Sequence, residues 1–293
     1  MPSYPCIAAA RRFDRSAHLP WVVGAERVGW IRRSDVRVLE RWPAVFEIDS
    51  AAVRLNAALH DCAARSEALA EVIAELAQTG HIKGWRGETF AVRNRFDDAP
   101  LALIERAASR FFGSMTYAVH VNGMLFADTL TPRHDGPALW IARRSAAKPT
   151  DPGMLDSLVG GGIGWGYGIG ETLIKESWEE SGIPAELAAQ ATRGRVAHVL
   201  SSIEQGTQEE LLYIYDLVLP TDFAPVAQDQ EVAEHRIAGI PELLQIIAAQ
   251  AMTVDASIAT LDCLARRGWL AADACAALNT LFQAPRVTLA LAS

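Results

Sequence analysis

The stretch that decides the fold is "SLVGGGIGWGYGIGETLIKESWEESGIP", residues 157–184, which has seven glycines in its first half and four glutamates in its second. Glu176, Glu179 and Glu180 are spaced i, i+3 and i+4, so on a helix they share one face within one turn. Three like charges there repel one another unless a cation offsets them, and Mg²⁺ takes carboxylate oxygens together with substrate phosphates. The spacing therefore favours a magnesium site over the alternative, a solvated acidic face.

The glycine run does not match the known nucleotide-phosphate loops. No register of it satisfies GxGxxG, and no GK[ST] follows it. We expect a flexible loop that leads from a buried strand, residues 138–145, into the acidic helix. Such a loop lets the backbone come close to a ligand without side-chain clash. A mobile surface loop is the alternative interpretation.

The same residues resemble the Nudix box, G, five residues, E, seven residues, REUxEExGU, where U is aliphatic. The matching positions are Gly161, Lys175-Glu176, Glu179-Glu180 and Gly182-Ile183. Three positions depart from the pattern: Tyr167 replaces the first glutamate, Lys175 the arginine and Ser177 the aliphatic residue. Glu171 matches another glutamate that is common in such helices and is expected to compensate in part for Tyr167.

The flanking segments "ARRSAAKPTDPGMLDSLVGGG" and "ETLIKESWEESGIP" are similar to Nudix proteins that carry a thiamine-pyrophosphokinase-related N-terminal extension. This resemblance implies a Nudix α/β/α sandwich with a mixed sheet, residues 113–285, behind a smaller α+β domain, residues 1–112. It also implies hydrolysis of oxidised thiamine diphosphate analogues to their monophosphates. A nucleoside diphosphate derivative is the alternative substrate. A Nudix-fold binding module without catalysis is the alternative function, which Tyr167 would support.

The resemblance also implies roles for the acidic residues. Glu176 and Glu180 are expected to be the principal ligands of Mg²⁺, or of Mn²⁺ in its place, with Glu179 as a further ligand or as the partner of an activated water. In Nudix enzymes the general base comes either from the box or from a later loop. Our candidate in a later loop is Glu231 in "DQEVAEHR", with an exposed loop acid as the alternative, and Glu209 and Glu210 are weaker candidates.

Basic residues near the box are candidates for binding the substrate phosphates. Arg143 and Arg144 end the strand before the glycine run, and strand alternation allows only one of them to face the pocket. Lys148 is the third basic candidate, with a surface lysine as the alternative. Gly161 and Gly162 are expected to let the backbone approach the diphosphate.

Aromatic residues surround the same segment. Trp165 and Tyr167 lie in the glycine run, where they are candidates for stacking on a heterocycle. Trp178 is expected to face the core, because its position on the helix points away from the metal.

The composition limits the other classes of function. At 293 residues, with half of them hydrophobic, the chain is expected to form two globular domains, and its net charge of −8 argues against a nucleic-acid surface. Four cysteines without a CxxC pair, and the absence of an apolar run of membrane length, predict a reduced, cytoplasmic protein that does not enter a membrane. The expected partner is a small-molecule diphosphate. A homodimer is suggested only because homodimers are common among proteins of this size.

The remaining pattern predicts the secondary structure. A long amphipathic helix is expected over residues 55–79, and a hairpin turn at Asn122-Gly123. Further strands are expected over residues 195–203 and 210–220, and the pattern becomes helical from Pro241 onward.

Overall fold

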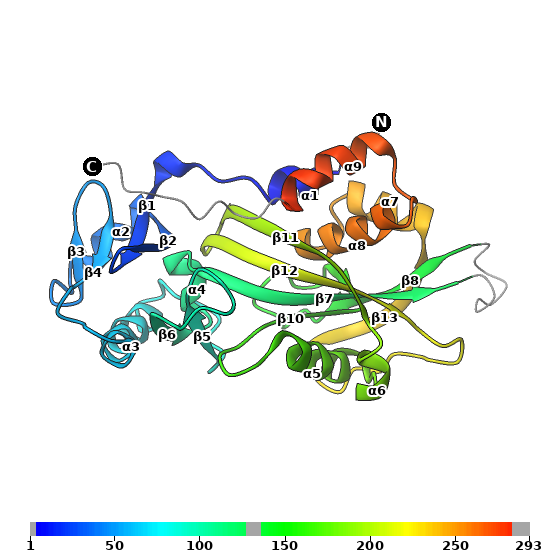
Figure 1. Ribbon diagram of the computed structural model, residues 1–293, viewed down its shortest axis with the longest axis horizontal. Coiled ribbons are helices and arrows are strands. Elements are labelled where there is room, and N and C mark those ends of the chain that lie inside the picture. Colours follow the sequence, from blue (N-terminus) through cyan, green and yellow to red (C-terminus); the bar gives the residue numbers. More distant parts are fainter. Residues whose placement is uncertain (1–3, 127–135, 283–293) are drawn as a thin grey trace.

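The computed structural model describes residues 4–126 and 136–282. The chain forms an elongated molecule in which residues 18–112, the N-terminal unit, lie at one end and residues 113–282, the C-terminal unit, at the other (Figure 1). The core of the N-terminal unit draws on residues from Leu19 to Phe112. The domain ranges 1–112 and 113–285 stay a prediction, and residues 283–285 lie outside the described residues.

A mixed seven-stranded sheet forms the centre of the C-terminal unit. Its main path runs β11-β12-β7-β8-β13, with β10 paired to β7 and β9 paired to β8. β12 runs parallel to β7, and the other pairings are antiparallel. The strands are β7 (Met115–Leu125), β8 (Ala138–Arg144), β9 (Leu155–Ser157), β10 (Val159–Gly162), β11 (Thr192–Ile203), β12 (Gly206–Val218) and β13 (Val232–Gly239).

Helices cover both faces of this sheet (Figure 1). One hydrophobic core lies between the sheet and α5 (Ile169–Ser181) with α6 (Ala185–Ala188). The other lies between the sheet and α7 (Ile240–Ala248), α8 (Val254–Arg266) and α9 (Ala272–Asn279), the last followed by the 3-10 turn η3 (Thr280–Phe282). The expected α/β/α sandwich with a mixed sheet is confirmed, as are the strands over residues 138–145, 195–203 and 210–220 and the C-terminal helices.

β7 corrects the predicted hairpin. It is one continuous strand from Met115 to Leu125, and its register with β12 runs unbroken through Asn122 and Gly123. The Asn122 amide is buried, where its Nδ2 donates to Asp216 Oδ1 at 3.1 Å and to the Ala259 carbonyl at 3.1 Å. Pairing on both edges keeps the backbone extended, so the tertiary contacts outweigh the local turn preference. The segment predicted to form the hairpin is residues 115–128, of which residues 127 and 128 lie outside the described residues.

The N-terminal unit is α+β, as expected. Its four-stranded sheet has the order β2-β1-β4-β3, and β5 pairs with β6 in a separate ribbon. The strands are β1 (His18–Val23), β2 (Glu26–Arg32), β3 (Phe46–Ile48), β4 (Val53–Leu55), β5 (Thr89–Val92) and β6 (Ala102–Glu105). The helices are α2 (Arg33–Leu39), α3 (Cys62–Gln78) and α4 (Ala108–Phe112), and the 3-10 turn η1 (Arg15–Ala17) precedes β1.

The helix predicted over residues 55–79 is shorter at its start. The Asp61 side chain accepts a hydrogen bond from the Ala64 amide at 2.9 Å and caps α3, which begins at Cys62. Leu55 instead ends β4, where the sheet takes up its backbone hydrogen bonds. The local spacing of apolar residues did not distinguish these two states.

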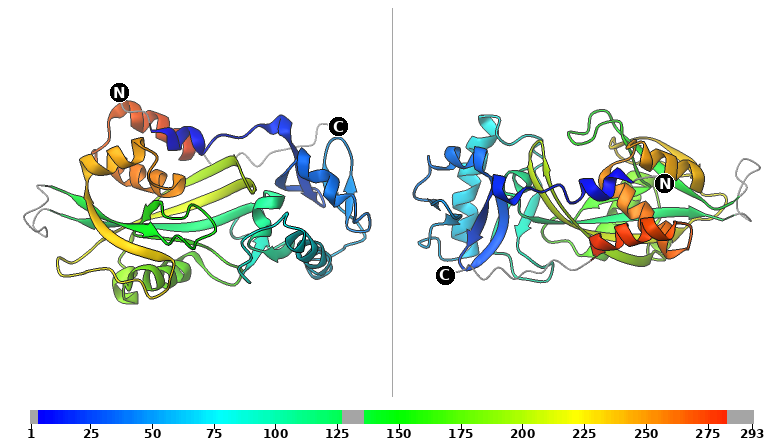
Figure 2. Two further views of the ribbon diagram at one scale, coloured as in Figure 1. Left: turned by 180° about the vertical axis from the view of Figure 1, so that it is seen from behind. Right: turned by 90° about the horizontal axis from the view of Figure 1, so that it is seen from above.

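The two units meet along β2 and β12. Arg27 of β2 forms an ion pair with the buried Glu209 of β12 at 2.9 Å, and the Trp30 amide donates to the Gly113 carbonyl at 3.2 Å. The first helix, α1 (Pro5–Ala9), packs against α8 of the C-terminal unit, and the chain that follows it leads across to the N-terminal unit, as the view from above in Figure 2 shows. Glu209 is therefore part of the contact between the units.

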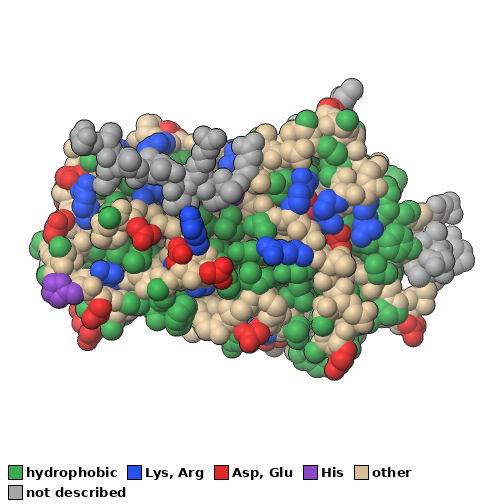
Figure 3. All heavy atoms as spheres, in the orientation of Figure 1, with side chains coloured by type: hydrophobic (Ala, Val, Ile, Leu, Met, Phe, Trp, Pro, Cys, Tyr) green, Lys and Arg blue, Asp and Glu red, His purple; other side chains and the backbone are tan. Residues whose placement is uncertain are grey.

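The described residues contain no helix that is both long and apolar enough to cross a membrane. All four cysteines are free thiols, as expected. On the face drawn in Figure 3, acidic and basic side chains are interspersed at both ends of the molecule.

Candidate active site

Helix α5 and strand β10 bring the box residues together. Glu171 Oε2 accepts from the Gly168 amide at 2.8 Å and so caps the start of α5, which is the role the structure gives this glutamate. A loop was predicted for the whole glycine run, but its first three glycines form β10 instead. This strand is antiparallel to β7, with Gly161 opposite Val119. The glycine run therefore begins as a fixed strand and becomes a loop only after Gly162.

Two glutamates of α5 lie against this strand. A Cβ at Gly161 would be 2.3 Å from Glu176 Cδ, so only glycine leaves room for that carboxylate. One turn further along α5, Glu180 Oε2 accepts from the Gly160 amide at 2.7 Å. The glycines thus allow α5 to approach β10 closely and hold two carboxylates beside the strand backbone.

Lys148 links the box to the later loop. Its Nζ lies 3.4 Å from Glu180 Oε1 and 2.5 Å from Glu231 Oε2, and the residue is buried rather than on the surface. The other oxygen of Glu231 accepts from Arg86 Nη1 at 2.8 Å. An ion-pair chain, Arg86–Glu231–Lys148–Glu180, therefore runs from the N-terminal unit to helix α5.

These environments shift the carboxyl groups in opposite directions. Burial raises the pKa of Glu180 to about 8, although Lys148 opposes the shift, and burial likewise raises the pKa of Glu176. Burial alone would also raise the pKa of Glu231, but the hydrogen bond and charge of Lys148, followed by those of Arg86, outweigh it and lower that pKa to about 2. While these pairs persist, Glu231 is a weak proton acceptor, and its role as general base stays a prediction.

The third box glutamate lies at the edge of the site. Lys175 Nζ contacts Glu179 Oε2 at 2.6 Å and Glu176 Oε1 at 3.1 Å, so this lysine pairs with glutamates of its own helix. Among residues 4–126 and 136–282, no three His, Cys, Asp or Glu side chains are grouped so that they could hold a metal ion. The three glutamates as a joint metal cluster stay a prediction.

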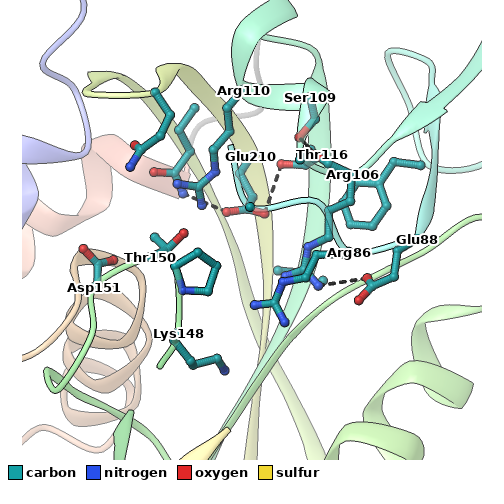
Figure 4. Close-up of a pocket in the computed structure, with 18 of the residues that line it drawn as sticks. Arg86, Glu88, Arg106, Ser109, Arg110, Thr116, Lys148, Thr150, Asp151 and Glu210 are labelled. Carbon is teal, nitrogen blue, oxygen red and sulfur yellow. Dashed lines mark hydrogen bonds and ion pairs between the residues drawn. The ribbon is translucent and has the colours of Figure 1, made fainter. Parts of the chain in front are cut away.

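A cavity of about 620 Å³ opens beside these residues, between the two units. It is within the size range of small-molecule sites. Figure 4 shows Arg86, Arg106 and Lys148 around it, and Arg110 with Glu210 at another part of its wall. The predicted residues that line it are Arg144, Lys148, Gly161, Gly162, Glu176, Glu179, Glu209, Glu210 and Glu231.

The structure separates the two arginines that end β8. Arg144 lines the cavity, where its Nη1 donates to Asp156 Oδ2 at 2.7 Å. Arg143 is absent from the cavity wall and forms an ion pair with Glu234 at 2.6 Å. Strand alternation places only one of the two at the site, and that one is Arg144.

The aromatic residues near the box have other positions than those predicted. Trp165 and Tyr167 are 41% and 51% exposed and do not line the cavity. Trp178, expected in the core, is 52% exposed. The sheet-facing side of α5 is taken by Leu173 and Ser177, so position 178 falls on the outer face.

Sequence reasoning missed the cavity residues that come from the N-terminal unit. Arg86 lies just before β5, Arg106 just after β6 and Arg110 in α4, all far from the box in sequence and outside any motif. Asp255, at the start of α8, was also missed. No local pattern marks these residues, because only the packing of the two units brings them to the box.

Comparisons with known proteins divide the chain in two. Residues 4–116 match the model described as "Domain of unknown function (DUF4743)", and residues 126–256 match the NUDIX domain. A crystal structure of DR0079 from Deinococcus radiodurans is 23% identical, with a TM-score of 0.44, over 60% of this chain and 99% of that one. The thiamine-pyrophosphokinase-related character of the extension stays a prediction.

Two curated plant proteins are similar over most of the chain. "Nudix hydrolase 24, chloroplastic" of Arabidopsis thaliana is 35% identical over 254 residues, which are 85% of this chain and 68% of that protein. "Nudix hydrolase 20, chloroplastic" of the same plant is 32% identical over 262 residues, 86% of this chain and 68% of that protein. The chain therefore belongs to the Nudix hydrolases, enzymes that act on phosphorus anhydrides.

Proposed function

We propose that this protein is an Mg²⁺-dependent hydrolase that cleaves the diphosphate of an oxidised thiamine diphosphate analogue to the monophosphate and phosphate. One observation carries the hydrolase part of the proposal. Glu176 lines a cavity whose wall also carries Lys148, Lys175 and Arg144, and Glu180, which is not in that wall, is held against β10 one turn further along α5. Carboxylates and cations together in a cavity of ligand size suit a metal-bound diphosphate.

The carboxylates fit a magnesium ion held by few protein ligands. Mg²⁺ is usually bound through one or two carboxylates, with waters and substrate phosphates completing its shell, so a cluster of three protein ligands is not required. Glu176 and Glu180 have raised pKa values because they are buried, so a cation beside them would offset that cost. Glu176 and Glu180 would hold the ion, with Glu179 at the edge, and it would supply charge neutralisation and a water of lowered pKa.

The chain's own residues position the substrate. Lys148 and Arg144 bring positive charge to the cavity, where phosphate oxygens would take their hydrogen bonds. A water oxygen adds to phosphorus as the bond to the bridging oxygen breaks, so phosphate and the monophosphate ester leave. Glu179, 38% exposed and at the cavity edge, is the candidate partner of that water.

The other part of the cavity suits a heterocycle that donates hydrogen bonds. Gln208 Nε2 bridges Glu210 Oε2 at 2.8 Å and Asp255 Oδ2 at 2.9 Å. Burial, followed by the nearby charge of Glu210, raises the pKa of Asp255 to about 7. This carboxyl pair offers acceptors to an amino group on a heterocycle, which is compatible with the pyrimidine of the thiamine-type substrate that the resemblance implies and also with the base of a nucleotide.

Product analysis tests the proposal. The purified protein is incubated with Mg²⁺ and, in turn, thiamine diphosphate, its oxidised analogues, ADP-ribose and nucleoside triphosphates, with Glu176→Gln as control. We expect monophosphate and phosphate only from the thiamine-type compounds, and none from the variant. If only the nucleotides were hydrolysed, the proposed diphosphate hydrolysis would stand and the thiamine-type substrate would be rejected. Tight binding of a compound that is returned unchanged would favour the binding module.

A further inference from the structure

We propose that the N-terminal unit supplies Arg86 and Arg106 to bind the phosphates of the substrate, so that the active site is shared between the two units. This inference rests on the function proposed above and deepens it, because neither arginine belongs to the Nudix box. It gives the DUF4743 segment, residues 4–116, a direct part in recognising the diphosphate.

Arg86 reaches the site from just before β5. Its backbone amide donates to Glu105 Oε1 at 2.8 Å, which fixes the main chain at this point. Its side chain makes one hydrogen bond within the described part of the chain, from Nη1 to Glu231 Oε1. A guanidinium carries five N–H donors, so most of those of Arg86 stay available to an anion in the cavity.

Arg106 reaches the site from just after β6. Its backbone amide donates to the Glu88 carbonyl at 2.8 Å, and its Nη1 to Glu88 Oε2 at 2.9 Å. A Cβ at Gly162 would lie 3.5 Å from Arg106 Nη2, so the guanidinium lies directly beside strand β10. Figure 4 shows the side chains of Arg86 and Arg106 on the same side of the cavity, with Lys148 across from them.

The β5–β6 ribbon, which the two arginines flank, is hydrogen-bonded to the loop between β10 and helix α5. The Trp165 amide, in the loop after β10, donates to the Thr89 carbonyl of β5 at 2.7 Å. This hydrogen bond ties the main chain of β5 to the loop that leads into the box helix, so the arginines that flank the ribbon are attached to the same framework as the box glutamates.

Phosphate can replace the present partners of these arginines. The side chains of Glu88 and Glu231 are 44% and 36% exposed, so both carboxylates can be hydrated when an anion takes their place at the arginines. A phosphate group offers a guanidinium paired, charge-assisted hydrogen bonds, which are stronger. Binding of a diphosphate would therefore move Arg86 and Arg106 from carboxylate to phosphate oxygens.

The test uses imidodiphosphate, a diphosphate mimic that resists hydrolysis, and the full-length protein in Mg²⁺. Arg86→Gln and Arg106→Gln are each expected to weaken its binding in calorimetry by about tenfold, the effect of losing a charge-assisted contact. The KM of the diphosphate that the wild type hydrolyses should rise similarly, with a smaller change in kcat. Arg86→Lys and Arg106→Lys should fall between wild type and the glutamine variants, because lysine keeps the charge without the fork.

Two matched arginines serve as controls. Arg41 pairs with Glu75 on the N-terminal unit, and Arg143 pairs with Glu234 at the end of β8; neither lines the cavity. Arg41→Gln and Arg143→Gln should change imidodiphosphate binding less than about twofold. Thermal melting of every variant separates loss of binding from loss of the fold.

The outcomes separate this inference from the proposed activity. Unchanged binding in folded Arg86→Gln and Arg106→Gln, or no binding by the wild type, would overturn the inference even if diphosphates are hydrolysed. Binding that depends on both arginines, in a protein that hydrolyses no compound of the panel, would keep the inference and reject the hydrolase.

Discussion

Replacing Gly161 by alanine tests how the glycine strand serves the box helix. The new Cβ would lie 2.3, 2.4 and 2.5 Å from Cδ, Cγ and Oε2 of Glu176. Carbon atoms in contact are about 3.5–4.0 Å apart, so the carboxylate must move by about 1 Å or more. Because misplacing a reacting group by that distance can cost about 100-fold in rate, we expect kcat to fall by that order.

The matched control is Gly164→Ala, in the same segment. Its Cβ would meet the Thr89 carbonyl oxygen at 3.6 Å and a Tyr167 ring carbon at 3.8 Å, which are ordinary contacts. Steady-state hydrolysis of the best diphosphate substrate, with urea denaturation of each variant, separates the two effects. Because the new Cβ meets only outer atoms of the Glu176 side chain, which can turn aside, the unfolding free energy should fall by about 1 kcal/mol, the low end of the cost of overpacking. A Gly161→Ala protein that turns over at the wild-type rate would show that Glu176 needs no fixed place.

Three further predictions concern the energetics of single side chains. The folded-state pKa of Glu180, about 8, lies above its ordinary 4.5, so the stability that this group contributes is full below pH 4.5 and is lost as pH rises toward 8. The metal-free Glu180→Gln protein should therefore melt at a higher temperature than wild type at pH 8. Equal melting temperatures would reject the raised pKa. Asp216, 1% exposed, has a lowered pKa because its hydrogen bonds with Arg266 outweigh burial. Asp216→Asn should therefore lower the unfolding free energy, measured in urea, by about 3 kcal/mol at pH 7 and by less below pH 3.8. A loss that does not depend on pH would contradict this. Trp178→Ala, at an exposed position, should change the unfolding free energy by about 0.5 kcal/mol or less. The control Trp21→Ala, in the core, should lower it by about 3–5 kcal/mol. Similar losses in the two variants would show that Trp178 is buried.

Local spacing predicted the acidic helix and much of the sheet. The glutamates at i, i+3 and i+4 lie on one helix, and the alternation of β8 sends Arg144 to the cavity and Arg143 away. These predictions succeed because the periods of helices and strands fix side-chain direction within a few residues. The same reasoning failed at Asn122-Gly123, where pairing with strands distant in sequence keeps a turn-prone dipeptide extended.

The sequence by itself determined the family, the box helix and the acidic residues that the chemistry would use. Only the tertiary structure decided that Lys148 is buried between Glu180 and Glu231, that Trp178 faces outward, and that Arg86 of the N-terminal unit completes the ion-pair chain. Burial and charge pairing depend on which distant segments meet, and no local period records that choice. The cavity between the two units therefore depends on how they pack, whereas the box is a local pattern of residues that the sequence alone shows.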